Sequence, residues 1–198
     1  MDRTNETKLD FDKLITAETV IFFDMDGTLI DTNFANFLSY KKSIQTVIGI
    51  ENDLIYNSDQ RFNRSTLKLS IPNLSNAEYE KVIIEKERIY SEYLNETILI
   101  VRVAEILFKY SETNITVLVT NCRKDRALLT LNHFGLTEKF SEIFYRQCCD
   151  NVTRTNKYQK AITSLNISPN SVIVFENEEP EIIDAKNAGI PSNNILNL

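Results

Sequence analysis

Two carboxylates stand one residue apart directly after an apolar run, in the stretch Val20-Ile-Phe-Phe-Asp24-Met-Asp26-Gly27. The apolar run is typical of a buried strand, and Gly27 indicates a turn directly behind it. Two like charges at the end of a buried strand cost free energy unless a cation offsets them. The pair therefore predicts a functional site. A bound cation would offset the repulsion between the two acids, and a role in chemistry would explain why the cost is tolerated.

Two further apolar runs, residues 115–119 and 171–175, also end in polar residues. These polar residues are Thr120 and Asn121 after the first run, and Glu176 and Asn177 after the second. In open parallel sheets, ligands bind at the carboxyl ends of the strands. We therefore expect all of these side chains to lie near Asp24 and Asp26, at one edge of a sheet.

A lysine completes this set of side chains. Lys157 begins a stretch with helical periodicity, and Asn156 before it is a residue type that caps helices. Lys160 is the alternative lysine. The set then contains two carboxylates, a hydroxyl, an ammonium and further oxygen ligands, which are the groups needed for metal-assisted phosphoryl transfer.

The elements that must position these residues alternate between strands and helices. Strand patterns cover residues 19–24, 115–121, 141–145 and 171–177, with a short last strand at 195–198. Helical patterns cover residues 126–134, 157–165 and 181–189. This alternation predicts an α/β fold: a Rossmann-like parallel sheet with helices on both faces.

The segment from about residue 33 to 97 breaks the alternation. Two stretches in it, residues 34–50 and 76–94, have helical periodicity, and no strand pattern occurs there. We therefore predict an all-helical cap inserted after the first strand. In this interpretation residues 1–32 and 98–198 form a Rossmann-like core domain, and residues 33–97 form the cap domain.

Composition narrows the choice of partners. The 198 residues are 42% hydrophobic, which supports a packed core, and the net charge of −6 argues against nucleic acid as a partner. No apolar run approaches the roughly 20 residues of a membrane span, and the first residues lack the apolar region of a signal peptide. We expect a cytoplasmic protein without a membrane or nucleic-acid partner, and the oligomeric state stays open.

At this point the residues carry a resemblance to a known family. The stretch DMDGTLID resembles the first motif of the haloacid dehalogenase-like hydrolase superfamily, DxDGT with its TLxD extension. Thr120 resembles the second motif, Lys157 the third, and VFENEEPEIIDAKNAG a variant of the fourth region. The four blocks occur in the family's order between about residues 19 and 190, and the helical segment resembles the family's small helical cap.

The resemblance implies a magnesium-dependent phosphatase that acts on a small phosphorylated metabolite through an aspartyl phosphate. Asp24 would be the nucleophile, and Asp26 the general acid and then the base. Thr120, Asn121 and Lys157 would bind the phosphate. The Mg²⁺ ligands would come from Asp24, Asp26 through its backbone carbonyl, Glu176 and Asn177.

Some features keep alternatives open. Asn177 stands where the family's fourth region usually has an acid, so Glu176 or Glu181 would have to supply the missing charge. A sugar phosphomutase would use the same groups. A binding or regulatory protein on a decayed phosphatase fold is a further alternative, because of Asn177. We interpret three cations of the cap as an exposed helix face rather than as substrate contacts: Arg61, Arg64 and Lys68.

Overall fold

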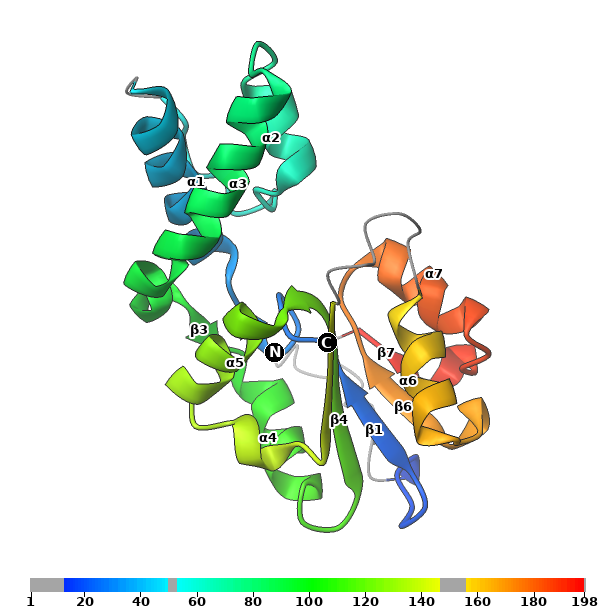
Figure 1. Ribbon diagram of the computed structural model, residues 1–198. Helices are drawn as coiled ribbons and strands as arrows, with labels where there is room; N and C mark the ends of the chain where they lie inside the picture. The colour runs from blue at the N-terminus through cyan, green and yellow to red at the C-terminus, as the bar shows by residue number, and fades with distance from the viewer. Residues whose placement is uncertain (1–12, 50–52, 147–155, 198) are drawn as a thin grey trace, which may run out of the picture.

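A parallel sheet forms the centre of the protein, which was analysed as a computed structural model that describes residues 13–49, 53–146 and 156–197. Its five strands lie in the order β5-β4-β1-β6-β7 (Figure 1), and every neighbouring pair is parallel. The strands are β1 (Val20–Phe23), β4 (Ile115–Arg123), β5 (Glu142–Arg146), β6 (Val172–Phe175) and β7 (Ile195–Leu196). The predicted α/β fold with a parallel sheet is confirmed.

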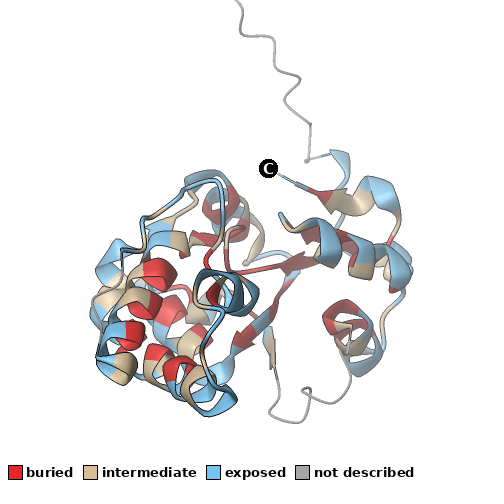
Figure 2. Ribbon diagram, turned by 90° about the horizontal axis from the view of Figure 1, so that it is seen from above, coloured by how far each residue is buried: buried red, intermediate tan, exposed pale blue. Residues whose placement is uncertain are grey.

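Helices cover both faces of the sheet. The helices are α4 (Val101–Tyr110) and α5 (Lys124–His133) on one face, and α6 (Lys157–Leu165) and α7 (Glu179–Asn187) on the other. The side chains of β1 alternate between these layers, with Ile21 and Phe23 packing toward α4 and α5 and Val20 and Phe22 toward α6 and α7. Figure 2 shows the result: buried residues along the strands, and exposed residues on the outer surfaces of the helices.

A tight turn follows β1 and holds the two acids. The Asp24 amide donates to the Phe175 carbonyl at 3.0 Å, and the Gly27 amide donates to the Ile30 carbonyl at 2.8 Å. Gly27 has φ +87°, and a Cβ there would lie 2.6 Å from Asn177 Nδ2. Both the backbone conformation and the close approach of Asn177 therefore require glycine at this position.

The helical insert leaves and rejoins the core at one place. Two short strands, β2 (Ile30–Asp31) and β3 (Ile98–Leu99), pair antiparallel at its base. The described residues between them contain α1 (Asn33–Ile48), α2 (Arg64–Ser70), α3 (Asn76–Ile89) and the 3-10 segment η2 (Tyr90–Glu96). The predicted helical insertion after the first strand is confirmed. Ser75 caps α3 and forms a capping box with Glu78.

The insert has a hydrophobic core of its own. Its buried apolar residues come from α1, α2, α3 and the chain before α2: Phe37, Tyr40, Ile44, Phe62, Leu67, Val82 and Ile83. Across the part of the chain that the structure describes, no helix is both long enough and apolar enough to span a bilayer.

One strand is longer than the sequence suggested. β4 continues through Thr120 and Asn121 to Arg123, where it pairs with Arg146 of β5 after a register shift. The predicted strand end at Asn121 is therefore wrong by two residues. Pairing with β5 extends the strand, and the apolar pattern of β4 alone does not contain that information.

Candidate active site

Lys157 lies against Asp24, although the two residues are far apart in the sequence. The Asn156 side chain caps α6 and fixes Lys157 in its first turn. Lys157 Nζ lies 2.7 Å from Asp24 Oδ1 and 2.8 Å from Glu176 Oε2, and all three side chains are buried. The structure thus brings Lys157, rather than Lys160, to the end of β1.

Glu176 positions this lysine. Its Oε2 atom accepts hydrogen bonds from Lys157 and from the Tyr158 hydroxyl, the latter at 2.5 Å. Its Oε1 atom accepts the backbone amides of Asn177 and Glu178 at 2.9 and 3.0 Å. Both oxygens of Glu176 are thus engaged within the protein, where they fix Lys157 and the turn after β6.

Asp24 lies in an environment that disfavours its ionised form. Burial raises the pKa of Asp24 to about 7; Lys157 opposes the rise, while Glu176 and Asp26 add to it. Burial alone would lower the pKa of Lys157, but Asp24 and Glu176 outweigh that effect and raise it. A further cation beside Asp24 would therefore stabilise its ionised form.

Asp26 has a different environment. Its Oδ1 atom accepts the Thr32 hydroxyl at 2.7 Å, and its Oδ2 atom lies 2.9 Å from Arg126 Nη2 and 3.3 Å from Arg61 Nη2. Burial raises the pKa of Asp26, but Arg126, Arg61 and Thr32 outweigh it and lower the pKa to about 2. The pKa values of Asp24 and Asp26 are therefore shifted in opposite directions, a pattern that separates the roles of paired carboxylates.

The three residues predicted to bind phosphate line one small cavity at this edge of the sheet: Thr120, Asn121 and Lys157. Thr120 is buried, and its hydroxyl accepts the Cys122 amide at 3.1 Å. Asn121 donates from Nδ2 to Glu181 Oε1 at 3.0 Å. Glu181 Oε2 lies 3.6 Å from Lys157 Nζ, so Glu181 also belongs to this edge.

The oxygen donors that could hold a metal ion come from the ends of β1 and β6. Asp24 Oδ2 accepts no hydrogen bond from the described residues. Asn177 Oδ1 accepts the Thr28 hydroxyl at 3.0 Å, which places the amide beside the turn that follows β1. Within the described residues no group of three or more His, Cys, Asp or Glu side chains forms a metal site. The donor types suit Mg²⁺, but the set carries little negative charge.

Two arginines at Asp26 were not identified from the sequence. The interpretation of Arg61 as part of an exposed helix face is wrong, because Arg61 precedes α2 and contacts both Asp26 and Glu178. Arg126 lies in the first turn of α5 and also donates to Asn36 Oδ1 at 2.9 Å. Arg126 begins the predicted helix that follows the strand end at Asn121, and this position is the sequence signal that could have identified it.

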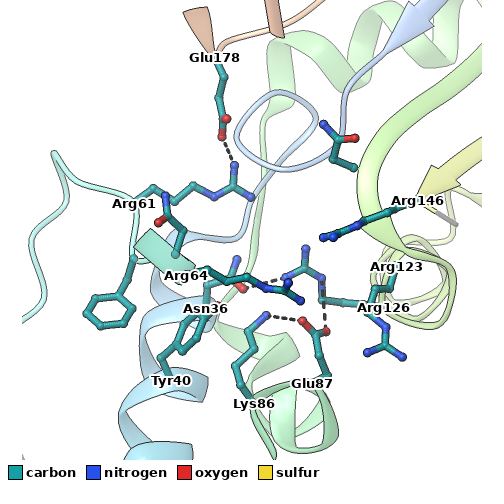
Figure 3. Close-up of a pocket in the computed structure, with 13 residues that line it drawn as sticks. Asn36, Tyr40, Arg61, Arg64, Lys86, Glu87, Arg123, Arg126, Arg146 and Glu178 are labelled. Atoms are coloured by element: carbon teal, nitrogen blue, oxygen red, sulfur yellow. Dashed lines mark hydrogen bonds and ion pairs between the residues drawn. The ribbon is translucent and has the colours of Figure 1, made fainter. Parts of the chain in front are cut away.

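A pocket of about 200 Å³ opens beside these arginines, between the helical insert and the core. Figure 3 shows Arg64 from the insert and Arg146 from β5 pointing into it, with Arg126 between them. Its lining residues are Asn36, Tyr40, Arg61, Phe62, Asn63, Arg64, Lys86, Glu87, Asn121, Arg123, Arg126, Arg146 and Glu178. Unlike Arg64, Lys68 lies over the Tyr79 ring, 4.8 Å from its centroid.

Solved structures share this fold over most of their length. A haloacid dehalogenase-like family hydrolase from Streptococcus pneumoniae superposes with TM-score 0.71 and 16% identity, covering 89% of this chain and 83% of that one. A subfamily IA hydrolase from Geobacter sulfurreducens superposes with TM-score 0.65 and 21% identity, covering 88% and 85%. A predicted phosphoglycolate phosphatase from Haemophilus somnus superposes with TM-score 0.72 and 19% identity, covering 92% of this chain and 85% of that one.

The sequence profile of one family matches nearly the whole chain. The family is described as "Haloacid dehalogenase-like hydrolase", and the match runs from residue 21 to residue 195. It therefore includes the acid pair, Lys157 and the strand end at Glu176. The chain belongs to the haloacid dehalogenase-like hydrolase family.

Proposed function

We propose that the chain is a magnesium-dependent phosphatase that hydrolyses a small phosphomonoester through an aspartyl phosphate on Asp24. One observation carries this proposal: the ammonium of Lys157 lies 2.7 Å from Asp24 at the carboxyl edge of the sheet, with Asp26 two residues further on. A carboxylate held by a lysine, with a second carboxylate beside it, suits nucleophilic attack on phosphorus followed by hydrolysis.

In the first step a carboxylate oxygen of Asp24 attacks phosphorus, and the bond from phosphorus to the leaving oxygen breaks. Asp26 donates its proton to that oxygen. In the second step Asp26 takes a proton from water, which attacks the aspartyl phosphate and releases inorganic phosphate. Lys157 and the Thr120 hydroxyl stabilise the charge that develops on the phosphoryl oxygens.

Mg²⁺ would be held by Asp24, the backbone carbonyl of Asp26 and Asn177, with Glu176 behind them. When bound, the ion neutralises charge on the phosphoryl group and on Asp24. The Asp24 Oδ2 atom, which accepts no hydrogen bond from the described residues, supports this assignment because it is available to a cation. Asn177 contributes oxygen without charge, so the proposed site depends on fewer anionic ligands.

The helical insert would act as the cap. In this proposal residues 33–97 form the cap domain, and residues 1–32 and 98–198 form the core domain. Arg61 supports the assignment, because it extends from the insert to Asp26 and Glu178 of the core. Closure of the cap would exclude bulk water during phosphoryl transfer. We place the activity in the cytoplasm on the basis of composition.

The proposal is tested by the turnover of an aryl phosphate with and without Mg²⁺. Wild-type protein should release phosphate only with the metal. Asp24→Asn should show no turnover and an unchanged far-UV circular dichroism spectrum, because an amide cannot form the acyl phosphate. Substantial activity in the folded Asp24→Asn protein would overturn the mechanism.

A further inference from the structure

The pocket between cap and core is positively charged, although the chain carries a net charge of −6. Six of its lining side chains are cationic and two are acidic. The cations are Arg61, Arg64, Lys86, Arg123, Arg126 and Arg146, and the acids are Glu87 and Glu178. Cations concentrated in one cleft of an acidic protein point to an anionic ligand.

Several of these charges are only partly compensated within the protein. Lys86 is 2% exposed, and among the described residues it pairs with Glu87 at a long distance of 3.4 Å. Arg126 pairs with Asp26 at 2.9 Å, and its Nε lies 4.0 Å from the same glutamate, so Glu87 faces two cations. Arg64 takes part in no ion pair with the residues that the structure describes. Like charges held close together out of water cost free energy, and a bound anion would offset that cost.

The pocket adjoins the proposed acid, Asp26, without including its side chain in the lining. Arg61 and Arg126 line it, and both contact Asp26, the group that would protonate the leaving oxygen. Asn121 and Arg146 line both this pocket and the small cavity of Thr120 and Lys157. A substrate whose phosphoryl group sits at Asp24 can therefore extend its leaving group into the pocket.

We propose that this pocket binds a second strong anion on the leaving group of the substrate, a phosphate or a carboxylate, through Arg64, Lys86, Arg126 and Arg146 (Figure 3). The inference rests on the proposed phosphatase function and narrows its substrate class. Planar guanidinium groups match the two-oxygen geometry of both anions. The volume of about 200 Å³ is large enough for a short or single-ring leaving group.

Three esters with the same three-carbon chain test the proposal. They are 3-hydroxypropyl phosphate, 3-(phosphonooxy)propanoate and propane-1,3-diyl bisphosphate, which end in a hydroxyl, a carboxylate and a phosphate. For at least one anionic ester, kcat/KM should exceed that of the neutral ester by about 100-fold, since a hydrogen bond to a charged group contributes roughly 1.5–3 kcal/mol. The more favoured ester identifies the anion.

Variants assign this preference to the pocket. Arg64→Gln should reduce the ratio of anionic to neutral kcat/KM to about tenfold or less, because it removes one charged contact. Arg88→Gln is the matched control, because Arg88 also lies in the insert but is 66% exposed and pairs with Glu85 outside the pocket. It should leave the ratio unchanged.

A binding measurement separates this inference from the proposed function. Calorimetry with the Asp24→Asn protein should show tighter binding of the bisphosphate than of 3-hydroxypropyl phosphate, and Arg64→Gln should remove the difference. Preferential binding without turnover of any ester by wild type would refute the phosphatase and keep the subsite. Turnover of all three esters at equal kcat/KM would overturn the subsite alone. If all three esters react at equal rates and added sulfate raises those rates, the pocket binds a separate anion rather than the leaving group. That result would also overturn the subsite.

Discussion

Arg61 lies in the helical insert and Asp26 follows β1 of the sheet, yet Arg61 Nη2 lies 3.3 Å from Asp26 Oδ2. Arg126 approaches the same oxygen from α5 at 2.9 Å. Two arginines, one from the insert and one from the core, thus hold the proposed acid and base in its ionised form.

Removal of Arg61 should raise the pKa of Asp26. Arg126 and Arg61 both lower this pKa, and Asp26 must be protonated to act as the acid. Arg61→Gln removes one of these charges, so the pKa of Asp26 should rise by about one unit. NMR titration of the Asp26 carboxyl in wild type and variant measures the shift. Arg88→Gln serves as the control, and an Asp26 pKa that does not change contradicts the assigned contact.

The acid role of Asp26 is tested by varying the leaving group. Asp26→Asn should slow formation of the phosphoenzyme from an alkyl phosphate by roughly 10²–10⁴-fold, the usual contribution of a positioned acid. An aryl phosphate with a very acidic phenol should lose much less, since its leaving oxygen needs no proton. Single-turnover measurements isolate this step, and equal losses for both esters would exclude the role.

A change at Asn177 should alter the demand for magnesium. Asn177→Asp keeps an oxygen beside Thr28 and adds a negative charge at the proposed metal site. Cation affinity rises with ligand charge, so half-maximal activity should require several-fold less Mg²⁺. Asn187→Asp is the control, because Asn187 is exposed at the last residue of α7. If both variants titrate like wild type, Asn177 is not a ligand, and Glu181 is the next candidate.

Lys86 should make the stability of the protein depend on pH. Burial, with Arg126 nearby, lowers the pKa of Lys86 to about 7, against the opposing effects of Glu87 and Asp26. Between this value and the 10.5 of an exposed lysine, the unfolded chain binds more protons than the folded one. The free energy of unfolding therefore gains a contribution that rises with pH across this window and is smallest at its acid end.

Lys86→Met removes the titrating group and with it this slope. The free energy of unfolding of the variant relative to wild type should fall by about 2 kcal/mol between pH 7 and 9, at roughly 1.4 kcal/mol per unit. Urea denaturation at the two pH values measures the difference, and the other titrating groups cancel in the comparison. A difference that stays constant would mean that Lys86 is charged throughout.

The sequence by itself determined the fold class and the centre of the candidate site. Continuous apolar runs identify the strands, because a strand buried on both faces must be apolar along its length. The same runs predict that the acids after β1 lie near the polar residues after β6, since the carboxyl ends of parallel strands share an edge. Asn156 marked the start of α6, which is why Lys157 could be favoured over Lys160.

Only the tertiary structure decided which cations reach Asp26. Residues 26, 61 and 126 are brought together by the packing of the insert against α5, and no local periodicity encodes that contact. Arginine side chains are long and have many rotamers, so their direction depends on the surfaces around them. The charge of the pocket has the same origin: its cations are scattered along an acidic chain, and they line one pocket only where the helical insert meets the sheet domain.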